Sequence, residues 1–88
     1  MIKRPKPERI RKIRLELLTR MRKRFPLVEL IDTEVRPAGT IVYRVYAPYD
    51  DGFEVLETIS GRLVDLAVDD KLDVLVVPLR EKPARRAA

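Results

Sequence analysis

The sequence predicts an α+β fold, a two-layer sandwich with the element order α-β-β-α-β, in which two helices pack on one face of a three-stranded sheet. Apolar residues recur at helical spacing over 8–25 and again over 52–70. Two stretches rich in β-branched residues flank a glycine-containing turn, and a third follows the second helical segment. A chain of 88 residues forms one domain. We place this domain at 8–79, between an extended basic lead-in at 1–7 and a disordered basic tail at 80–88.

The first predicted element is an amphipathic helix. Its apolar residues, spaced by three and four, are Ile10, Ile13, Leu17, Met21 and Phe25. The opposite face is almost continuous Arg and Lys. Pro26 disfavours helical geometry at the residue before it, so the helix should end at Phe25.

The segments 27–36 and 40–47 predict a hairpin, because the loop between them, Pro37-Ala38-Gly39, offers a glycine for a left-handed position. Side chains on a strand alternate between its two faces. Tyr43 therefore shares a face with Ile41 and Val45, and we expect it in the core, whereas Tyr46 points to the other face.

The second predicted helix covers 52–70. Asp51, followed three residues later by Glu54, forms a capping-box pattern at its start. Gly61 lies in the middle and costs up to ~1 kcal/mol relative to alanine. Three explanations are open: close approach to a neighbouring element, a break into two helices, or simple tolerance, which we favour.

The last predicted strand, 72–79, is apolar on both faces over 74–77, as expected of a strand covered on both sides. Two helices can cover only one face of the sheet, so pairing with a second copy would cover the other. The sequence therefore predicts a homodimer, with Tyr46, Val74 and Val76 as the candidate dimer or stacking residues.

The net charge of +5 hides an uneven distribution. Residues 1–24 carry +9, residues 25–78 carry −7, and residues 79–88 carry +3, by count of their basic and acidic side chains. The basic helix is the candidate contact surface for a nucleic acid or a protein partner. The candidate contact residues are Arg9, Lys12, Arg20, Lys23 and Arg24. The alternative is a solvated face whose charges are answered by the acidic body.

The missing residue types restrict the chemistry. The chain has no Cys, His, Trp, Asn or Gln, which excludes a disulfide, a zinc finger and a histidine-activated nucleophile. We expect a non-catalytic protein with no catalytic residues, no cofactor and no metal ligands. A metal-assisted enzyme is the alternative, and it would use the acidic loop residues Asp50, Asp51, Asp69 or Asp70.

No apolar run approaches the ~20 residues needed to span a bilayer, and no signal-peptide pattern is present. We therefore expect a cytoplasmic protein without membrane contact. Depletion of Asn, Gln and Cys is typical of thermophiles, whereas the excess of Arg over Lys fits a GC-rich genome equally well. The leading expectation is a small, homodimerising module that contacts another macromolecule through its basic helix.

The element order resembles the type II K-homology arrangement, an RNA-binding fold with two helices between its last two strands. That family grips the nucleic-acid backbone with a Gly-x-x-Gly loop joining those helices, and here Gly61 stands alone in Ser60-Gly61-Arg62. The resemblance implies RNA binding as an alternative function.

Residues 45–79 also resemble the later half of small nucleotidyltransferase-like proteins: a strand ending in acidic residues, an amphipathic helix and a β-branched strand. Those enzymes need a Gly-Ser pair and two carboxylates one residue apart on a strand. This chain has no Gly-Ser, and it has Tyr43-Arg44-Val45 where the carboxylate strand would fall. The resemblance implies a degenerate member without the catalytic apparatus.

Overall fold

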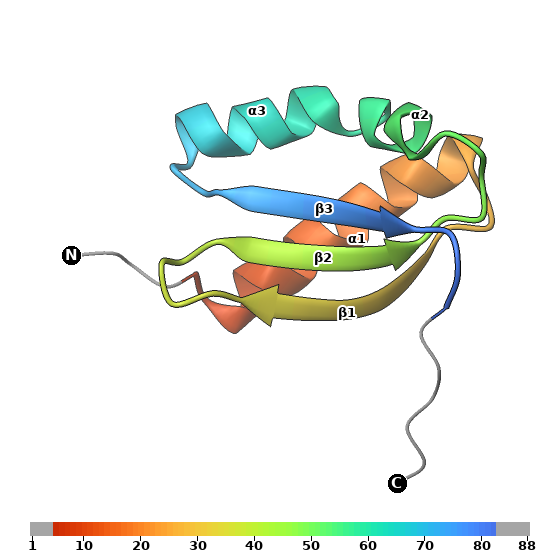
Figure 1. Cartoon of the computed structure of the whole chain (residues 1–88). Coiled ribbons are helices and arrows are strands. Elements are labelled where there is room, and N and C mark those ends of the chain that lie inside the picture. The colour runs from red at the N-terminus through yellow and green to blue at the C-terminus, as the bar shows by residue number, and fades with distance from the viewer. Residues whose placement is uncertain (1–4, 83–88) are drawn as a thin grey trace, which may run out of the picture.

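The structure is a computed structural model, and it describes residues 5–82. Its elements are α1 (Pro7–Arg24), β1 (Glu29–Val35), β2 (Ile41–Tyr46), α2 (Gly52–Glu57), α3 (Ser60–Asp69) and β3 (Val74–Leu79) (Figure 1). The predicted α+β class and element order are confirmed, with the second helical segment divided in two. Residues 1–4 of the expected lead-in and 83–88 of the expected tail lie outside the described residues.

The sheet has the strand order β1-β2-β3, with β1 antiparallel and β3 parallel to the central β2. The predicted hairpin is present. Gly39 has φ 94°, in the left-handed region that favours glycine, and its N–H donates to the Arg36 carbonyl at 2.8 Å. The parallel pairing of β2 and β3 requires a crossover, which α2 and α3 supply.

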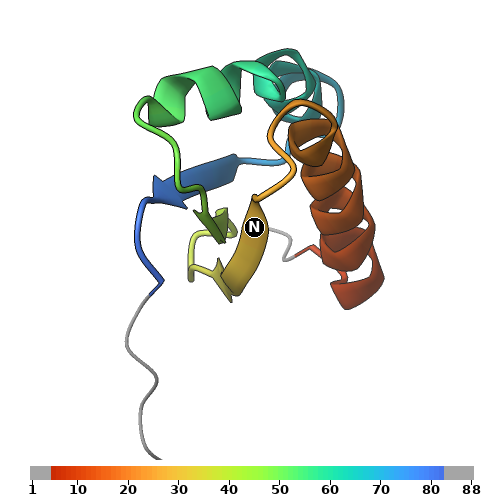
Figure 2. The same ribbon diagram turned by 90° about the vertical axis from the view of Figure 1, so that its right-hand side faces the viewer.

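All three helices lie on the same side of the sheet, as Figure 2 shows with α1 beside the strands and α2–α3 above them. The core lies between these two layers. From β2 it takes Ile41, Tyr43 and Val45, and from the helices it takes Ile13, Leu17, Met21, Val55, Ile59 and Leu66. The prediction that Tyr43 packs in the core with Ile41 and Val45 is confirmed.

The predicted single helix over 52–70 is instead two helices, which meet at Thr58 and Ile59. Ile59 is buried with φ −123°, outside helical geometry. The Thr58 hydroxyl donates to the Val55 carbonyl at 2.6 Å, a local bond that competes with helix continuation. A Cβ on Gly61 would meet nothing within 4 Å, so close approach does not explain this glycine.

Asp51 caps α2, because its carboxylate accepts the Phe53 N–H at 2.9 Å. The reciprocal bond of the predicted capping box is not made: within residues 5–82 the Glu54 carboxylate makes no hydrogen bond to Asp51. The acidic side chain of Glu54 still lies in the first turn of α2, where it suits the positive end of the helix dipole.

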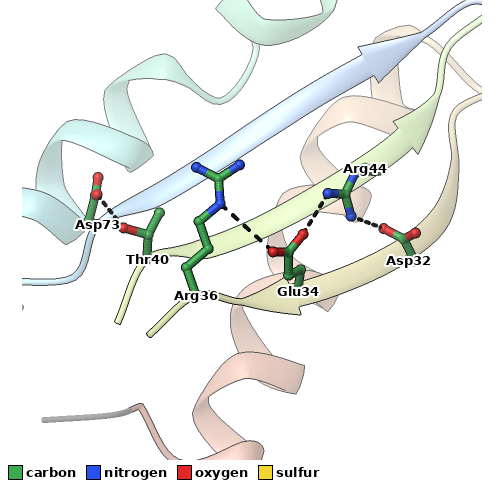
Figure 3. Close-up of polar contacts among 6 residues, drawn as sticks. All are labelled: Asp32, Glu34, Arg36, Thr40, Arg44 and Asp73. Carbon is green, nitrogen blue, oxygen red and sulfur yellow. Dashed lines mark hydrogen bonds and ion pairs between the residues drawn. The ribbon is translucent and has the colours of Figure 1, made fainter. Parts of the chain in front are cut away.

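The sheet face opposite the helices, called the open face below, is partly covered by charged side chains. Arg44 of β2 donates to Asp32 at 2.8 Å and to Glu34 at 2.6 Å, and Arg36 approaches Glu34 at 3.9 Å (Figure 3). The hydrogen bonds that Arg44 donates to Asp32 and Glu34 raise the pKa of its guanidinium. On the same face Val42 is only 1% exposed. The β1–β2 half of the open face therefore does not need a second molecule to cover it.

Among the described residues, no helix combines the length and the apolar character needed to cross a membrane.

Candidate nucleic-acid interface

α1 is held against the sheet by its apolar face. Leu17 is 2% exposed and lies between Ile13 and Met21 in the core. The Tyr43 hydroxyl donates to the Ile10 carbonyl at 2.6 Å and ties the first half of the helix to β2. The opposite, outer face of α1 is consequently presented to solvent on a fixed scaffold.

Two of the five predicted contact residues are engaged within the molecule. Arg9 forms an ion pair with Asp70 at the end of α3. The Glu16 carboxylate accepts hydrogen bonds from Arg20 at 3.1 Å and from Arg62 of α3 at 2.6 Å, so it links α1 to α3. The hydrogen bond to Glu16 raises the pKa of the Arg62 guanidinium. Arg9 and Arg20 lie on the flank of α1 that faces α3. On this flank the basic side chains are neutralised by acidic ones within the molecule, as the alternative interpretation of the basic helix expects.

The other basic residues of the outer face are not answered in this way. Arg11, Lys12, Arg22 and Lys23 are exposed, and none has a carboxylate within 4.0 Å among residues 5–82. Lys12 and Lys23 were predicted, whereas Arg11 and Arg22 were missed. Each precedes a predicted lysine in the chain, and both lie outside the buried stripe of Ile13, Leu17 and Met21, which was the signal available in the sequence.

Arg24, the fifth predicted residue, has a separate position. Its guanidinium carbon lies 5.4 Å from the centroid of the Phe25 ring, a cation–π distance. Phe25 is itself buried and packs edge-on against Tyr49, with ring centroids 4.8 Å apart. Arg24 therefore covers the end of the core and does not belong to the outer face.

The two helical units differ in charge. α1 carries eight basic and two acidic side chains, a net +6, whereas residues 52–70 carry five acidic and one basic, a net −4. The junction of α2 and α3, where a K-homology protein grips the nucleic-acid backbone, lies in the acidic unit. The two helices implied by that resemblance are present, but their charge does not suit a phosphate backbone.

The predicted dimer or stacking residues fall on different faces. Tyr46 lies on the open face, with the Lys82 ammonium 5.0 Å from its ring centroid. Val76 pairs with Tyr43 on the helix-covered face and is 4% exposed, and Val74 packs partly buried against the same core. These two valines are thus not available on the open face. The β3 side chains that do lie there are Leu75, Val77 and Leu79.

The free edge of β3 is also poorly suited to pairing with another strand. The Asp73 and Leu79 carbonyls accept hydrogen bonds from the N–H groups of Ile41 and Ala47. Backbone groups of successive residues point to opposite edges of a strand, so those of Val74, Val76 and Pro78 point away from β2. Pro78 has no N–H to offer. A Cβ on Gly52 would lie 3.0 Å from the Pro78 Cγ, which shows how closely α2 approaches this end of the edge.

Of the four predicted acidic loop residues, Asp50, Asp51 and Asp70 have partners among residues 5–82, Asp50 through Arg80 at 3.5 Å. Asp51 caps α2, Asp70 pairs with Arg9, and Asp73 accepts the Thr40 hydroxyl at 2.8 Å. Within the part of the chain that the structure describes, no group of three or more acidic side chains is placed to hold a metal ion.

Comparisons of the chain with protein-family models, with curated proteins and with solved structures find no match.

Proposed function

We propose that this protein is a non-catalytic module that binds single-stranded nucleic acid, RNA in the first place, through the outer face of α1. One observation carries the proposal: Arg11, Lys12, Arg22 and Lys23 are exposed on one face of α1 and lack carboxylate partners among residues 5–82, whereas Arg9, Arg44 and Lys82 are paired. Cations that are not neutralised internally release counterions when they meet a polyanion, and this release drives nucleic-acid binding.

The chemistry of this face favours phosphate over a protein partner. Leu15, 55% exposed, is the large apolar side chain on it, so the face lacks the apolar centre of a typical protein–protein interface. Arginine presents a planar fork of N–H donors that matches phosphate oxygens. The outer face carries no aromatic ring for base stacking. We therefore expect contacts to the sugar-phosphate backbone with little sequence preference.

The test is fluorescence anisotropy with a labelled oligouridylate of about twelve nucleotides at low salt. The double variant Lys12→Glu/Lys23→Glu should lose at least about tenfold in affinity. Lys71→Glu/Arg80→Glu, which makes the same change in net charge outside the outer face of α1, should lose less than about threefold. Equal losses in the two variants, or no binding by the native protein, would overturn the proposal.

Self-association is a second candidate, favoured by the apolar β3 half of the open face. Leu75 is 43% exposed there, and Val77 and Leu79 follow it along the same face of β3. The ion-paired β1–β2 half would form the polar rim of such an interface. Light scattering at micromolar concentration tests this: we expect a dimer that Leu75→Lys converts to a monomer. A native protein that is monomeric throughout rules out this interface.

A further inference from the structure

The four cations of the outer face of α1 that have no carboxylate partner among residues 5–82 form two matching pairs. Arg11 and Lys12 make an N-terminal dyad, and Arg22 and Lys23 make a C-terminal dyad with the same residues in the same order. The dyads are eleven residues apart, which is about three helical turns and about 16.5 Å along the axis. Eleven residues also bring the helix back to within about 20° of the same direction, so both dyads face the same way.

The surface between the dyads carries no free cation. Leu15 and Thr19 occupy the centre of that face, and the Thr19 hydroxyl donates to the Leu15 carbonyl at 2.7 Å. Arg14 and Arg20 lie between the dyads along the axis but about 120° around the helix from the centre of the face. Glu16, the acid in this stretch, is already bound to Arg20 and Arg62. The positive charge of the face is therefore concentrated at two separate points.

We infer that the two dyads form a two-point phosphate site. Both dyads bind the backbone of the same strand, at two positions that are about five nucleotides apart. This inference rests on the proposed function and adds the size and shape of its ligand. Phosphates along a stacked strand advance by about 3.4 Å per nucleotide, so about 16.5 Å corresponds to about five steps. Because α1 is fixed by its buried face, the two points keep their separation when the ligand binds.

A minimum ligand length follows. A strand of two or three nucleotides reaches one dyad, whereas a strand of six or more reaches both. Binding at the second dyad is then intramolecular and benefits from a high effective concentration. The affinity of the native protein should rise by at least about tenfold between three and six nucleotides and then level off, apart from the statistical gain of longer strands.

The experiment measures the affinity of a series of oligouridylates, from two to about twelve nucleotides, by competition against the labelled strand at low salt. Arg11→Ala/Lys12→Ala and Arg22→Ala/Lys23→Ala should each abolish the step between three and six nucleotides. The matched control is Arg9→Ala/Arg20→Ala, which removes the same charge from the same helix but from the paired flank, and it should keep the step.

The outcomes separate the inference from the proposed function. A smooth rise of affinity with length, or equal effects of the dyad variants and the control, overturns the two-point site while leaving nucleic-acid binding intact. Absence of binding at every length overturns both. Circular dichroism of each variant, with an unchanged spectrum and melting temperature, shows that a lost step reflects the surface and not the fold.

Discussion

α1 and the α2–α3 unit cover the same face of the same sheet, yet they are built differently. α1 is one helix with a net charge of +6, and residues 52–70 are two short helices with a net charge of −4. The two units meet along one flank, through Arg9 with Asp70 and Glu16 with Arg62. These ion pairs neutralise charges on that flank only, so the opposite side of α1 keeps its positive charge.

This difference shows that the amount of charge on an element does not define a site. Cations also lie on the sheet and just beyond it, but Arg44 of β2 lies between Asp32 and Glu34, and Lys82, which follows β3, pairs with Glu29 at 2.8 Å. The outer face of α1 is distinguished by four exposed cations on one side of a single helix, none with a carboxylate within 4.0 Å among residues 5–82. Four experiments sharpen this comparison, beginning with the largest expected effect.

The first experiment asks what holds α1 in place. Leu17→Ala should lower the free energy of unfolding by about 3 kcal/mol, because it leaves a cavity beneath a side chain that is 2% exposed. Lys12→Ala/Lys23→Ala on the outer face should change it by no more than about 0.5 kcal/mol. Denaturant unfolding gives both values. A large loss in the lysine variant would mean that the outer cations serve stability.

The second concerns the hydrogen bond between Tyr43 and the Ile10 carbonyl, which ties α1 to β2. Tyr43→Phe should cost about 1 kcal/mol at neutral pH. Burial raises the pKa of Tyr43 from 10.0 to about 12. Because the folded-state value is the higher one, its contribution is complete below pH 10.0 and is lost as the pH rises toward about 12. Unfolding curves across this range should fall less steeply for the variant; equal slopes would contradict this account of the tyrosine.

The third compares two glycines in the α2–α3 unit. Gly52→Ala should destabilise the protein by about 1 kcal/mol, because the new Cβ would lie 3.0 Å from Cγ of Pro78. Gly61→Ala meets open space in the first turn of α3 and should stabilise by about 0.5 kcal/mol. Thermal unfolding distinguishes the two. Effects of the same sign would show that α2 does not press on β3 as described.

The fourth and smallest tests an ion pair of the sheet. The hydrogen bond from Lys82 holds the pKa of Glu29 below 4.5, with Arg22 adding a weaker attraction, and the same bond raises the pKa of Lys82 above 10.5. The pair therefore stabilises the folded protein between pH 4.5 and pH 10.5, the ordinary pKa values of the two groups. This stabilisation is lost as the pH falls through the lowered value or rises through the raised one. In Lys82→Ala, carboxyl NMR should show the pKa of Glu29 moving back toward 4.5, and an unchanged value would contradict the pairing.

Much of the fold was predictable from local patterns. The spacing of Ile13, Leu17 and Met21 determined the buried face of α1, and the glycine turn determined the hairpin. The division of the second helix was not predictable with the same certainty, because Val55, Ile59 and Leu66 keep a helical spacing across the break. At the break the Thr58 hydroxyl donates to the Val55 carbonyl, a competing local hydrogen bond that the apolar pattern does not report.

The candidate site was only partly predictable. Charge counting identified α1 but could not separate Arg9, paired with Asp70 more than sixty residues away, from Arg11, which has no carboxylate partner among residues 5–82. Likewise, a strand that is apolar throughout 74–77 does not reveal which residues face the helices. The register with β2 assigned Val74 and Val76 to the core side and Leu75 to the open face. Both distinctions depend on contacts between distant parts of the chain.

The central claim is that the two dyads of α1 bind phosphates, and the salt dependence of oligouridylate binding tests it most directly. Four phosphate contacts on a single strand predict that log K falls with log salt at a slope of about −2.8 for the native protein. Removal of one dyad by Arg22→Ala/Lys23→Ala should reduce the slope to about −1.4. A slope that is the same with and without the C-terminal dyad, or binding that does not respond to salt, would contradict the account.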